Sequence, residues 1–411
     1  MGETAATAES VECRASWHMA IAAVVMLAVA AGAPLTIVVG LRTIADDMGG
    51  ARSLPSAAAA LAAFGSGLGG IMYGLLARRI GQKRAAMMGG TSIGAGLLLA
   101  SQGEPWQLLI GFALGVGLFG YGALFAPMVT FVSMWFDRRR GTALALVASG
   151  QYVAGVLWPT IFERAIAAYG WRATMLGYGI LCILLIVPLA ALVLRPPPAP
   201  VTVGPNAFRH VPGGRVFGMK PNLAMALLAF CSFLCCVPMA MPQSHLVAFC
   251  GDLGITASHG AAMLSALLLA AFVSRQFWGW ASDRIGGLWT VLAGSIAQTI
   301  GMAAFLSTQD EAGLFFIAAA NGLGFSGIIP AYVMAVRELF PPAEASWRVP
   351  ATLFVSLSGM AFGSWLAGAI FDGVGYYAAA WMVGIVFNLA QLALLGFLIA
   401  RHRRGRRLAV A

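Results

Sequence analysis

Charge is scarce in this chain. Charged residues make up 10% of the 411 positions, only 15 residues are Asp or Glu, and Lys occurs only at Lys83 and Lys220. Because about 25% charged residues is usual in a soluble protein, this composition excludes a soluble globular domain. The sequence also lacks a metal-ligand cluster, a nucleophile paired with a base and a phosphate-binding loop. We therefore expect no enzyme, no metal site and no cofactor.

Functional cysteine patterns are missing as well. The six cysteines lie in hydrophobic stretches or in the N-terminal tail, and they show no CxxC or other metal-type spacing. Buried thiols usually act as small apolar packing residues. We predict that role for all six.

Long hydrophobic stretches dominate the chain instead. It is 60% hydrophobic with a mean hydropathy of +0.85, and about 20 apolar residues span the ~30 Å hydrocarbon core of a bilayer. Twelve stretches reach this length, and the first is too long for a signal peptide. They run near residues 17–41, 56–77, 85–101, 106–134, 141–162, 173–194, 222–249, 260–281, 288–307, 312–336, 350–371 and 377–400. The sequence predicts an all-α polytopic membrane protein with twelve transmembrane helices.

Basic residues gather on one side of these stretches. If the N-terminus is cytoplasmic, the inner loops and tails carry 20 of the 25 Lys and Arg residues. The outer loops carry Arg42, Arg52, Arg164 and Arg172, and the remaining one is Arg275. Since positive residues favour the cytoplasmic side, both termini are predicted to be cytoplasmic, in what we expect to be a bacterial inner membrane. The net charge of +10 follows the loops, so it does not indicate nucleic-acid binding.

Two landmarks recur at one spacing. Gly74 and Gly279 open similar turns, Gly170 and Gly375 precede aromatic residues, and both 279 − 74 and 375 − 170 give 205. This offset, near half the chain length, indicates a duplicated six-helix unit with a substrate path between its halves. The predicted parts are a cytoplasmic tail (1–16), a six-helix bundle (17–194), a cytoplasmic linker (195–221), a second, pseudo-symmetric six-helix bundle (222–400) and a basic cytoplasmic tail (401–411).

Arg275 is the one charge that this pattern places inside a membrane. Residues 260–274 are almost wholly apolar, and Asp283 and Arg284 mark the exit to water, so Arg275 lies about two helical turns inside. A guanidinium at that depth costs from about 2.5 to more than 10 kcal/mol. Because no Asp or Glu falls in mid-span to neutralise it, Arg275 indicates a binding site for an anion. The alternative is a structural arginine that satisfies backbone carbonyls and locks helices together.

The two basic turns resemble a family signature. Gly74-Leu-Leu-Ala-Arg-Arg-Ile-Gly-Gln-Lys-Arg84 is similar to the loop G-x-x-x-D-R-x-G-x-K/R-K/R of the major facilitator superfamily, although Arg78 stands where that family usually has an acid. The second copy, Gly279-Trp-Ala-Ser-Asp-Arg-Ile-Gly286, keeps the acid. The resemblance implies a transporter that works by alternating access. It assigns gating roles to Gly74, Arg79, Gly81, Gly279, Asp283, Arg284 and Gly286.

Further segments resemble the monocarboxylate porter branch, which adjoins the bacterial oxalate/formate exchangers. They are Trp135-Phe-Asp-Arg-Arg-Arg-Gly141, Tyr169-Gly-Trp-Arg172, Pro242-Gln-Ser-His-Leu246 and the Arg four residues before Gly279. In that branch the helix-eight Arg binds the substrate carboxylate, which implies the same role for Arg275. The branch's Asp one turn earlier is Ala271 here, and the helix-eleven Lys of the oxalate exchangers is missing. One fixed positive charge favours a monoanion, such as lactate, pyruvate or another short monocarboxylate, over a dianion.

Polar side chains of other stretches complete the predicted site. We expect Tyr121, Tyr332 and Ser358 to contact the substrate, with Ser356 and Trp365 as walls. His245 is the candidate for proton coupling, or symport, because an imidazole titrates near physiological pH. Its alternative role is a hydrogen bond to the backbone at the outer end of its helix. We expect a monomer in the lipid bilayer.

Two rival functions remain open. One is an exporter of drugs or lipophilic compounds from the same superfamily. Since cationic cargo usually needs an acid in the cavity, a bulky lipophilic anion is its best cargo here. The other is a membrane receptor or membrane-embedded enzyme, for which the chain offers neither a sizeable extramembrane domain nor a catalytic constellation.

Overall fold

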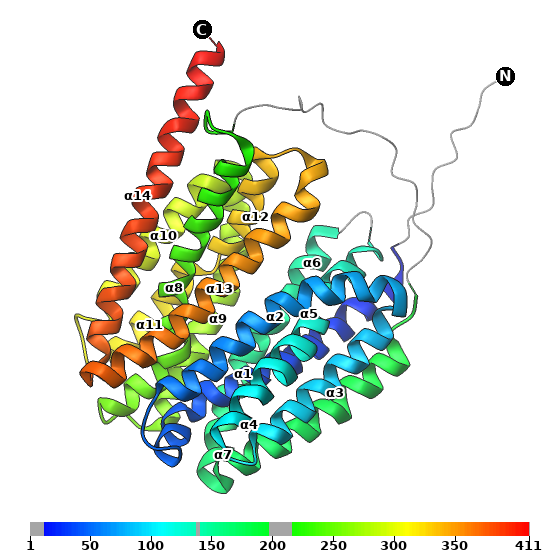
Figure 1. The fold of residues 1–411 in the computed structure, drawn as a ribbon, viewed down its shortest axis with the longest axis vertical. Helices are drawn as coiled ribbons and strands as arrows, with labels where there is room; N and C mark the ends of the chain where they lie inside the picture. Colours follow the sequence, from blue (N-terminus) through cyan, green and yellow to red (C-terminus); the bar gives the residue numbers. More distant parts are fainter. Residues whose placement is uncertain (1–11, 137–139, 197–215, 411) are drawn as a thin grey trace, which may run out of the picture.

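The computed structural model describes residues 12–136, 140–196 and 216–410, and helices make up nearly all of them (Figure 1). They are α1 (Arg14–Asp47), α2 (Ser53–Ile80), α3 (Gln82–Ala100), α4 (Pro105–Ile110), the π-helix η1 (Gly111–Tyr121), α5 (Gly122–Ser133), α6 (Arg140–Ala148), α7 (Gly150–Val193), α8 (Pro221–Asp252), α9 (Ala257–Ile285), α10 (Gly287–Ala304), α11 (Glu311–Phe325), α12 (Ile328–Leu339), α13 (Pro342–Val374) and α14 (Tyr377–Val410). Within these ranges the only strand-like pairing is an isolated bridge between Val216 and Met219. The predicted all-α class is confirmed.

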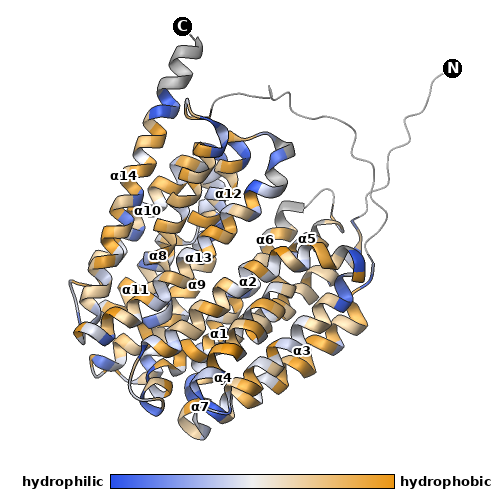
Figure 2. Ribbon diagram, in the orientation of Figure 1, coloured by the Kyte–Doolittle hydropathy of each residue, from blue (hydrophilic) through white to orange (hydrophobic). Residues whose placement is uncertain are grey.

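Ten segments of the described chain are long and apolar enough to cross a membrane. One of them, Leu146–Val193, has 48 residues and bends at Gly170 (φ 80°, ψ 163°), so it makes two passes. α3 adds a further helix of 19 residues. The described helices therefore provide the twelve predicted passes. Figure 2 shows hydrophobic residues along the helices and hydrophilic residues gathered toward their ends.

The duplicated unit is visible in the backbone. Three pairs of glycines, each pair 205 residues apart, adopt positive φ in turns between helices, a conformation that Gly reaches without steric strain. They are Gly49 and Gly254 (101° and 79°), Gly81 and Gly286 (82° and 81°), and Gly170 and Gly375 (80° and 81°). Two of these turns include the landmarks that the sequence offset pointed to, and the pair at 49 and 254 is new.

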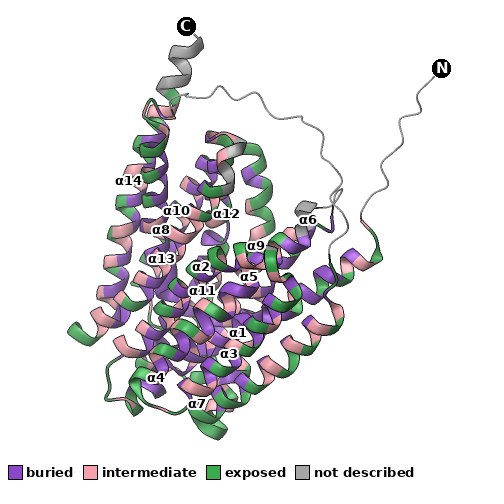
Figure 3. Ribbon diagram, turned by 45° about the vertical axis from the view of Figure 1, so that its right-hand side comes forward, coloured by how far each residue is buried: buried purple, intermediate pink, exposed green. Residues whose placement is uncertain are grey.

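Buried hydrophobic side chains form two large cores and a small cluster of Tyr73, Ala85 and Ala123. Figure 3 marks the buried residues along the helices. One core draws on residues 19–194, and the other mainly on residues 217–399. Val38, Leu41 and Tyr152 of the first half belong to the second core, so the halves touch there. The two cores match the predicted pair of helix bundles.

The bundle boundaries stay a prediction. α7 ends at Val193 and α8 begins at Pro221, close to the expected limits of the linker. Residues 197–215 of that linker, 1–11 of the N-terminal tail and 137–139 of the segment Trp135–Gly141 lie outside the described residues.

The halves pack mainly through two helix pairs, α2 with α13 and α7 with α9, and α1 also contacts α8. Glycine permits close approach in both pairs, as small residues do in membrane helices. A Cβ atom added at Gly155 of α7 would lie 2.3 Å from Leu268 of α9. One added at Gly368 of α13 would lie 2.5 Å from the Ser56 hydroxyl of α2.

Candidate functional site

A large cavity lies between the two halves. Its volume is about 2290 Å³. Its walls come from α1, α2, α3, η1, α5, α6 and α7 of the first half and from α8, α9, α11, α12 and α13 of the second. At one end, here named the open end, the cavity reaches Gly81 and Arg195. α1 begins and α14 ends on that side (Figure 1). The opposite end, which carries Arg52 and Asp252, is named the closed end, because no described residue of its interhelical loops lines the cavity.

Arg275 lines this cavity from α9, ten residues before the helix ends at Ile285. Its guanidinium carbon lies 4.8 Å from the ring centroid of Tyr152 in α7, on the other half of the molecule. The Nη1 atom is buried and has no hydrogen-bond partner. Among the described residues no carboxylate forms an ion pair with it. Arg275 therefore presents an uncompensated positive charge with free N–H donors to the cavity.

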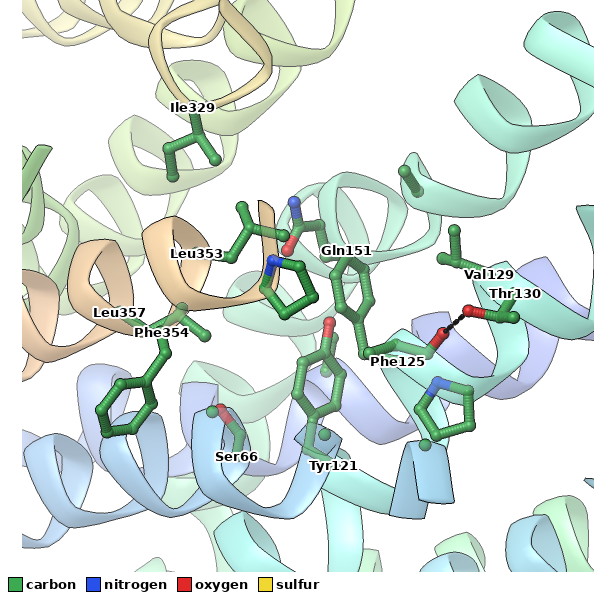
Figure 4. A pocket seen from close by; sticks show the side chains of 18 of the residues that line it. Ser66, Tyr121, Phe125, Val129, Thr130, Gln151, Ile329, Leu353, Phe354 and Leu357 are labelled. Carbon is green, nitrogen blue, oxygen red and sulfur yellow. Dashed lines mark hydrogen bonds between the residues drawn. The ribbon is translucent and has the colours of Figure 1, made fainter. Parts of the chain in front are cut away.

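Two tyrosines of the first half line the cavity together with Arg275. Tyr152 contacts its guanidinium, and Tyr121, which ends the π-helix η1, stacks on Phe125 with ring centroids 5.6 Å apart. In Figure 4 its hydroxyl and the Gln151 amide point into the same space. Hydroxyl and amide groups can donate hydrogen bonds to an anion.

The remaining central wall is apolar. Phe125 and Val129 face the cavity from the first half, and Ile329, Leu353 and Leu357 face it from the second (Figure 4). Few polar groups among many apolar ones are typical of a small-molecule site. This lining favours a cargo that combines a charged group with an apolar body.

The charged described residues that line the open mouth are all basic. Among the described lining residues five cations lie near this mouth, and none of the lining residues is Asp or Glu. The five are Arg79, Lys83, Arg84, Arg195 and Arg337. A cleft lined by one sign of charge raises the local concentration of the opposite ion. The mouth therefore attracts anions and repels cations.

The structure does not bring every predicted contact to this cavity. Tyr332 is fully buried in the second core, where its hydroxyl accepts a hydrogen bond from Gln391 at 3.1 Å. Ser358 donates to the Phe354 carbonyl at 2.9 Å and does not line the cavity, whereas Ser356 does. Trp365 also lies outside the lining. In this conformation neither Tyr332 nor Ser358 lines the cavity that Arg275 lines.

His245 is fully buried near the closed end of α8. Its Nε2 lies 2.8 Å from the Ser364 carbonyl oxygen and 3.4 Å from the Ser56 hydroxyl, and its Nδ1 lies 3.0 Å from the Tyr377 hydroxyl. The imidazole does not line the cavity. The candidate proton-coupling group is therefore part of the contact between the halves.

Arg52 joins the two halves at the closed end. Its guanidinium donates two hydrogen bonds to the Asp252 carboxylate, with N–O distances of 2.5 and 2.6 Å. It also donates to the Tyr377 hydroxyl at 3.0 Å and lies 3.8 Å from the ring centroid of Phe371. Asp372 accepts hydrogen bonds from the backbone N–H groups of Arg52 and Ser53, both at 2.8 Å. Burial alone would lower the pKa of Arg52, but the hydrogen bonds to Asp252 and Tyr377 outweigh it and raise that pKa above its ordinary value. Arg52 is thus a permanent cation.

The predicted gating turns occupy equivalent places in the two halves. Gly81 and Gly286 form the α2–α3 and α9–α10 turns, and Cβ atoms added at Gly74 and Gly279 would meet nothing within 4 Å. Arg79 lines the open mouth. Asp283 and Arg284 are exposed, and Arg284 stacks on Trp280 at 4.2 Å without an ion pair to any described residue. Because this end is open here, the two turns do not hold the halves together in this conformation.

Comparison with known proteins identifies the family. The model of the Major Facilitator Superfamily matches residues 19–249 and 228–410. The chain belongs to this superfamily. Monocarboxylate transporter 13 of Bos taurus is 27% identical over 350 residues, which cover 81% of this chain and 76% of that protein. The agnestins efflux protein AgnL12 of Paecilomyces divaricatus is 24% identical, with 72% and 67% covered.

Solved structures agree on the fold. A mutant of the nucleoside transporter NupG superposes on this major facilitator chain with a TM-score of 0.73 at 12% identity, covering 93% of this chain and 100% of that one. The protein is thus a multi-pass membrane transporter and not an enzyme. The resemblance that the two basic turns indicated is confirmed at the level of the superfamily.

Two features of this major facilitator protein were not predicted from its sequence, namely the contact of Tyr152 with Arg275 and the ion pair between Arg52 and Asp252. Tyr152 follows Gln151 in an apolar stretch, and nothing in the neighbouring sequence ties it to Arg275. Arg52 and Asp252 are 200 residues apart, so neither has a sequence neighbour that reveals the pair. The 205-residue offset does place Asp252 at the repeat position of Asp47, and that equivalence is the one signal that could have drawn attention to it.

Proposed function

We propose that the protein is a secondary active transporter of a small organic anion, most consistent with a monocarboxylate, which it moves by alternating access. The observation that carries this proposal is Arg275, whose buried Nη1 has no partner in a cavity without a described lining acid. A guanidinium binds a carboxylate through two parallel hydrogen bonds and has no accessible neutral state. The substrate supplies the missing negative charge.

The arrangement of the site explains how one anion contacts both halves. Arg275 belongs to α9 of the second half and Tyr121 to η1 of the first, and both line the same cavity. A carboxylate on Arg275 that also accepts the Tyr121 hydroxyl bond draws the halves together. Because Arg275 is the one cation among the described residues of the central cavity, a second carboxylate on the substrate would remain uncompensated in a low dielectric. The similarity to monocarboxylate transporter 13 supports the same substrate class.

A second cargo is favoured by the size of the cavity. Its volume of about 2290 Å³ exceeds the roughly 300–1,000 Å³ usual for ligand pockets, and its central wall is apolar. The chain is also similar to the efflux protein AgnL12. Export of a bulkier lipophilic anion through the same Arg275 site is therefore the alternative function.

Orientation follows from the charges. We propose that both termini and the basic mouth face the cytoplasm, because positive loops favour that side, and that the closed end faces outward. The structure then represents an inward-open state. The bacterial inner membrane and a monomeric carrier remain part of this proposal.

Transport in proteoliposomes tests the function. A panel of labelled mono- and dicarboxylates, bulky lipophilic carboxylates and organic cations is compared for wild type, Arg275→Lys and Arg275→Gln. Arg164→Gln is the matched control, because Arg164 is exposed and lies outside the cavity. Hydrogen bonds to charged groups contribute about 1.5–3 kcal/mol, so Arg275→Gln should weaken transport of the preferred anion more than about tenfold, while Arg275→Lys retains part of it.

Each outcome assigns the cargo. Preference for short monocarboxylates supports the main proposal, and preference for bulky lipophilic anions supports the export alternative. Full activity of Arg275→Gln, or stronger transport of cations than of anions, would overturn both.

A further inference from the structure

The contacts among Arg52, Asp252, Tyr377 and His245 at the closed end are here named the lock. Comparison of the two repeated halves explains why these contacts join one half to the other. In the first half Asp47 forms an ion pair with Arg172 at 2.9 Å, and both side chains are about half exposed. Adding 205 to each number gives Asp252 and Tyr377 in the second half. The acid is retained there, but its basic partner is replaced by a phenol. Asp252 therefore takes its cation, Arg52, from the other half of the molecule.

The direction of each hydrogen bond in this lock can be assigned. The Ser364 carbonyl oxygen can only accept, so Nε2 of His245 carries a hydrogen and donates to it. Arg52 has no acceptor, so it donates to the Tyr377 oxygen. In the neutral imidazole with hydrogen on Nε2, Nδ1 is an acceptor, and the Tyr377 hydroxyl donates to it. The closed arrangement thus holds His245 as one neutral tautomer.

Among the described residues no carboxylate lies within hydrogen-bond distance of the imidazole to stabilise an added proton. The charged and titratable groups that face His245 are Arg52 before α2, Asp252 at the end of its own helix, Asp372 of α13 and Tyr377 of α14. Asp252 is held by the Arg52 guanidinium, and both Asp372 oxygens accept backbone N–H groups. The uncharged neighbours, Ser56 and Ser364, offer a hydroxyl and a carbonyl.

We propose that His245 is a proton-binding site whose occupation opens the closed end. A proton that arrives from solution binds Nδ1 of His245, so the Tyr377 hydroxyl loses its hydrogen-bond acceptor. The new Nδ1–H then points toward the Tyr377 oxygen, which already accepts a hydrogen bond from Arg52. The added proton also places a second cation in a buried site beside Arg52, which burial makes unfavourable. Closure of this end therefore requires the proton to leave again. His245 acts as a gate sensor, and acid on that side favours the state that loads substrate there.

This inference rests on the proposed alternating access but not on the nature of the cargo. It is tested without substrate by the distance between spin labels on Gln102 and Gln309, which lie exposed at the closed end of the two halves. The full chain with Cys13→Ser in lipid nanodiscs is used, because the other five cysteines are buried. A failure of the anion experiment leaves this result standing, and a failure here leaves the anion site standing.

In the wild type we expect short distances at pH 8 and a growing population of longer distances as the pH falls toward 5. One proton linked to opening changes the ratio of open to closed molecules by up to about tenfold per pH unit. His245→Gln should remove this dependence. His259→Gln is the matched control, because His259 lies at the same end but is exposed and paired with Glu311 at 2.7 Å. It should keep the response.

Two variants probe the lock independently of the histidine. Tyr377→Phe removes the group that links Arg52 to His245, so the open population should rise several-fold at pH 8. Tyr377→Arg gives Asp252 a partner in its own half, as Arg172 does for Asp47, and should open this end further. An unchanged distance in the wild type between pH 8 and 5, a retained pH response in His245→Gln, or a fully closed Tyr377→Phe protein would each overturn the proposal.

Discussion

Removal of the Tyr152 ring should weaken anion binding while leaving the charge of Arg275 in place. The guanidinium carbon lies 4.8 Å from the ring centroid, which is within the range of a cation–π contact that holds the arginine side chain in place. Without the ring, the long arginine side chain must be ordered when the anion arrives. Ordering such a side chain costs about 0.5–1.5 kcal/mol. A value of about 1 kcal/mol predicts that Tyr152→Leu binds the preferred anion about fivefold more weakly.

The assay is a titration of purified protein with the preferred anion, in parallel with initial transport rates. Tyr152→Phe is the control, because it keeps the aromatic face and should bind within about twofold of the wild type. A thermal melt of each variant separates weaker binding from partial unfolding. Wild-type affinity in a folded Tyr152→Leu protein, or an equal loss in Tyr152→Phe, would refute the idea that the ring positions the guanidinium.

Three further predictions concern packing and electrostatics. Gly322→Ala should lower the melting temperature, because its Cβ atom would lie 2.1 Å from the Leu267 carbonyl oxygen and overpacking costs about 1–3 kcal/mol. Gly396→Ala should leave the melting temperature unchanged, because its Cβ atom would have no neighbour within 4 Å. Arg348→Met should destabilise the protein by about 1.5–3 kcal/mol, since Arg348 is 2% exposed and donates hydrogen bonds to Glu344 and Asn222. A melting temperature equal to that of the Arg164→Met variant would contradict this prediction. Entry of the anion from the open end should slow several-fold between about 0.02 and 0.5 M salt as the basic mouth is screened, and neutralising Arg79, Lys83 and Arg84 together should flatten that dependence.

The sequence predicted those features that depend on local composition. Twelve apolar stretches, the turn glycines Gly81 and Gly286, and the depth of Arg275 all follow from residues close together in the chain. The structure confirms the class and the number of helices, and it places Arg275 on the cavity. Each of these features is read from the order of residues within one helix or one turn.

The side chains on a helix that face the cavity could not be predicted in this way. Val333 lines the cavity and its neighbour Tyr332 does not, because successive residues on a helix point about 100° apart. Ser356 and Ser358 differ for the same reason. The rotation of α12 and α13 is set by their packing against neighbouring helices, which hydropathy does not record. The lock between Arg52 and Asp252 joins residues from different halves, so it becomes visible only when the halves are assembled.

The unpaired charge of Arg275 also has a consequence for the transport cycle. While the open end admits water the guanidinium is hydrated, but closing an empty cavity would leave it buried with only the face of Tyr152 against it. A buried charge without a partner costs several kcal/mol, and every 1.4 kcal/mol on the barrier slows a step about tenfold. A bound carboxylate removes that penalty, so the loaded protein should reorient faster than the empty one. Exchange of labelled anion against unlabelled anion inside proteoliposomes should therefore exceed net uptake into empty ones by tenfold or more, and Arg275→Gln should abolish the difference; equal rates in the wild type would show that Arg275 finds another partner when the cavity closes.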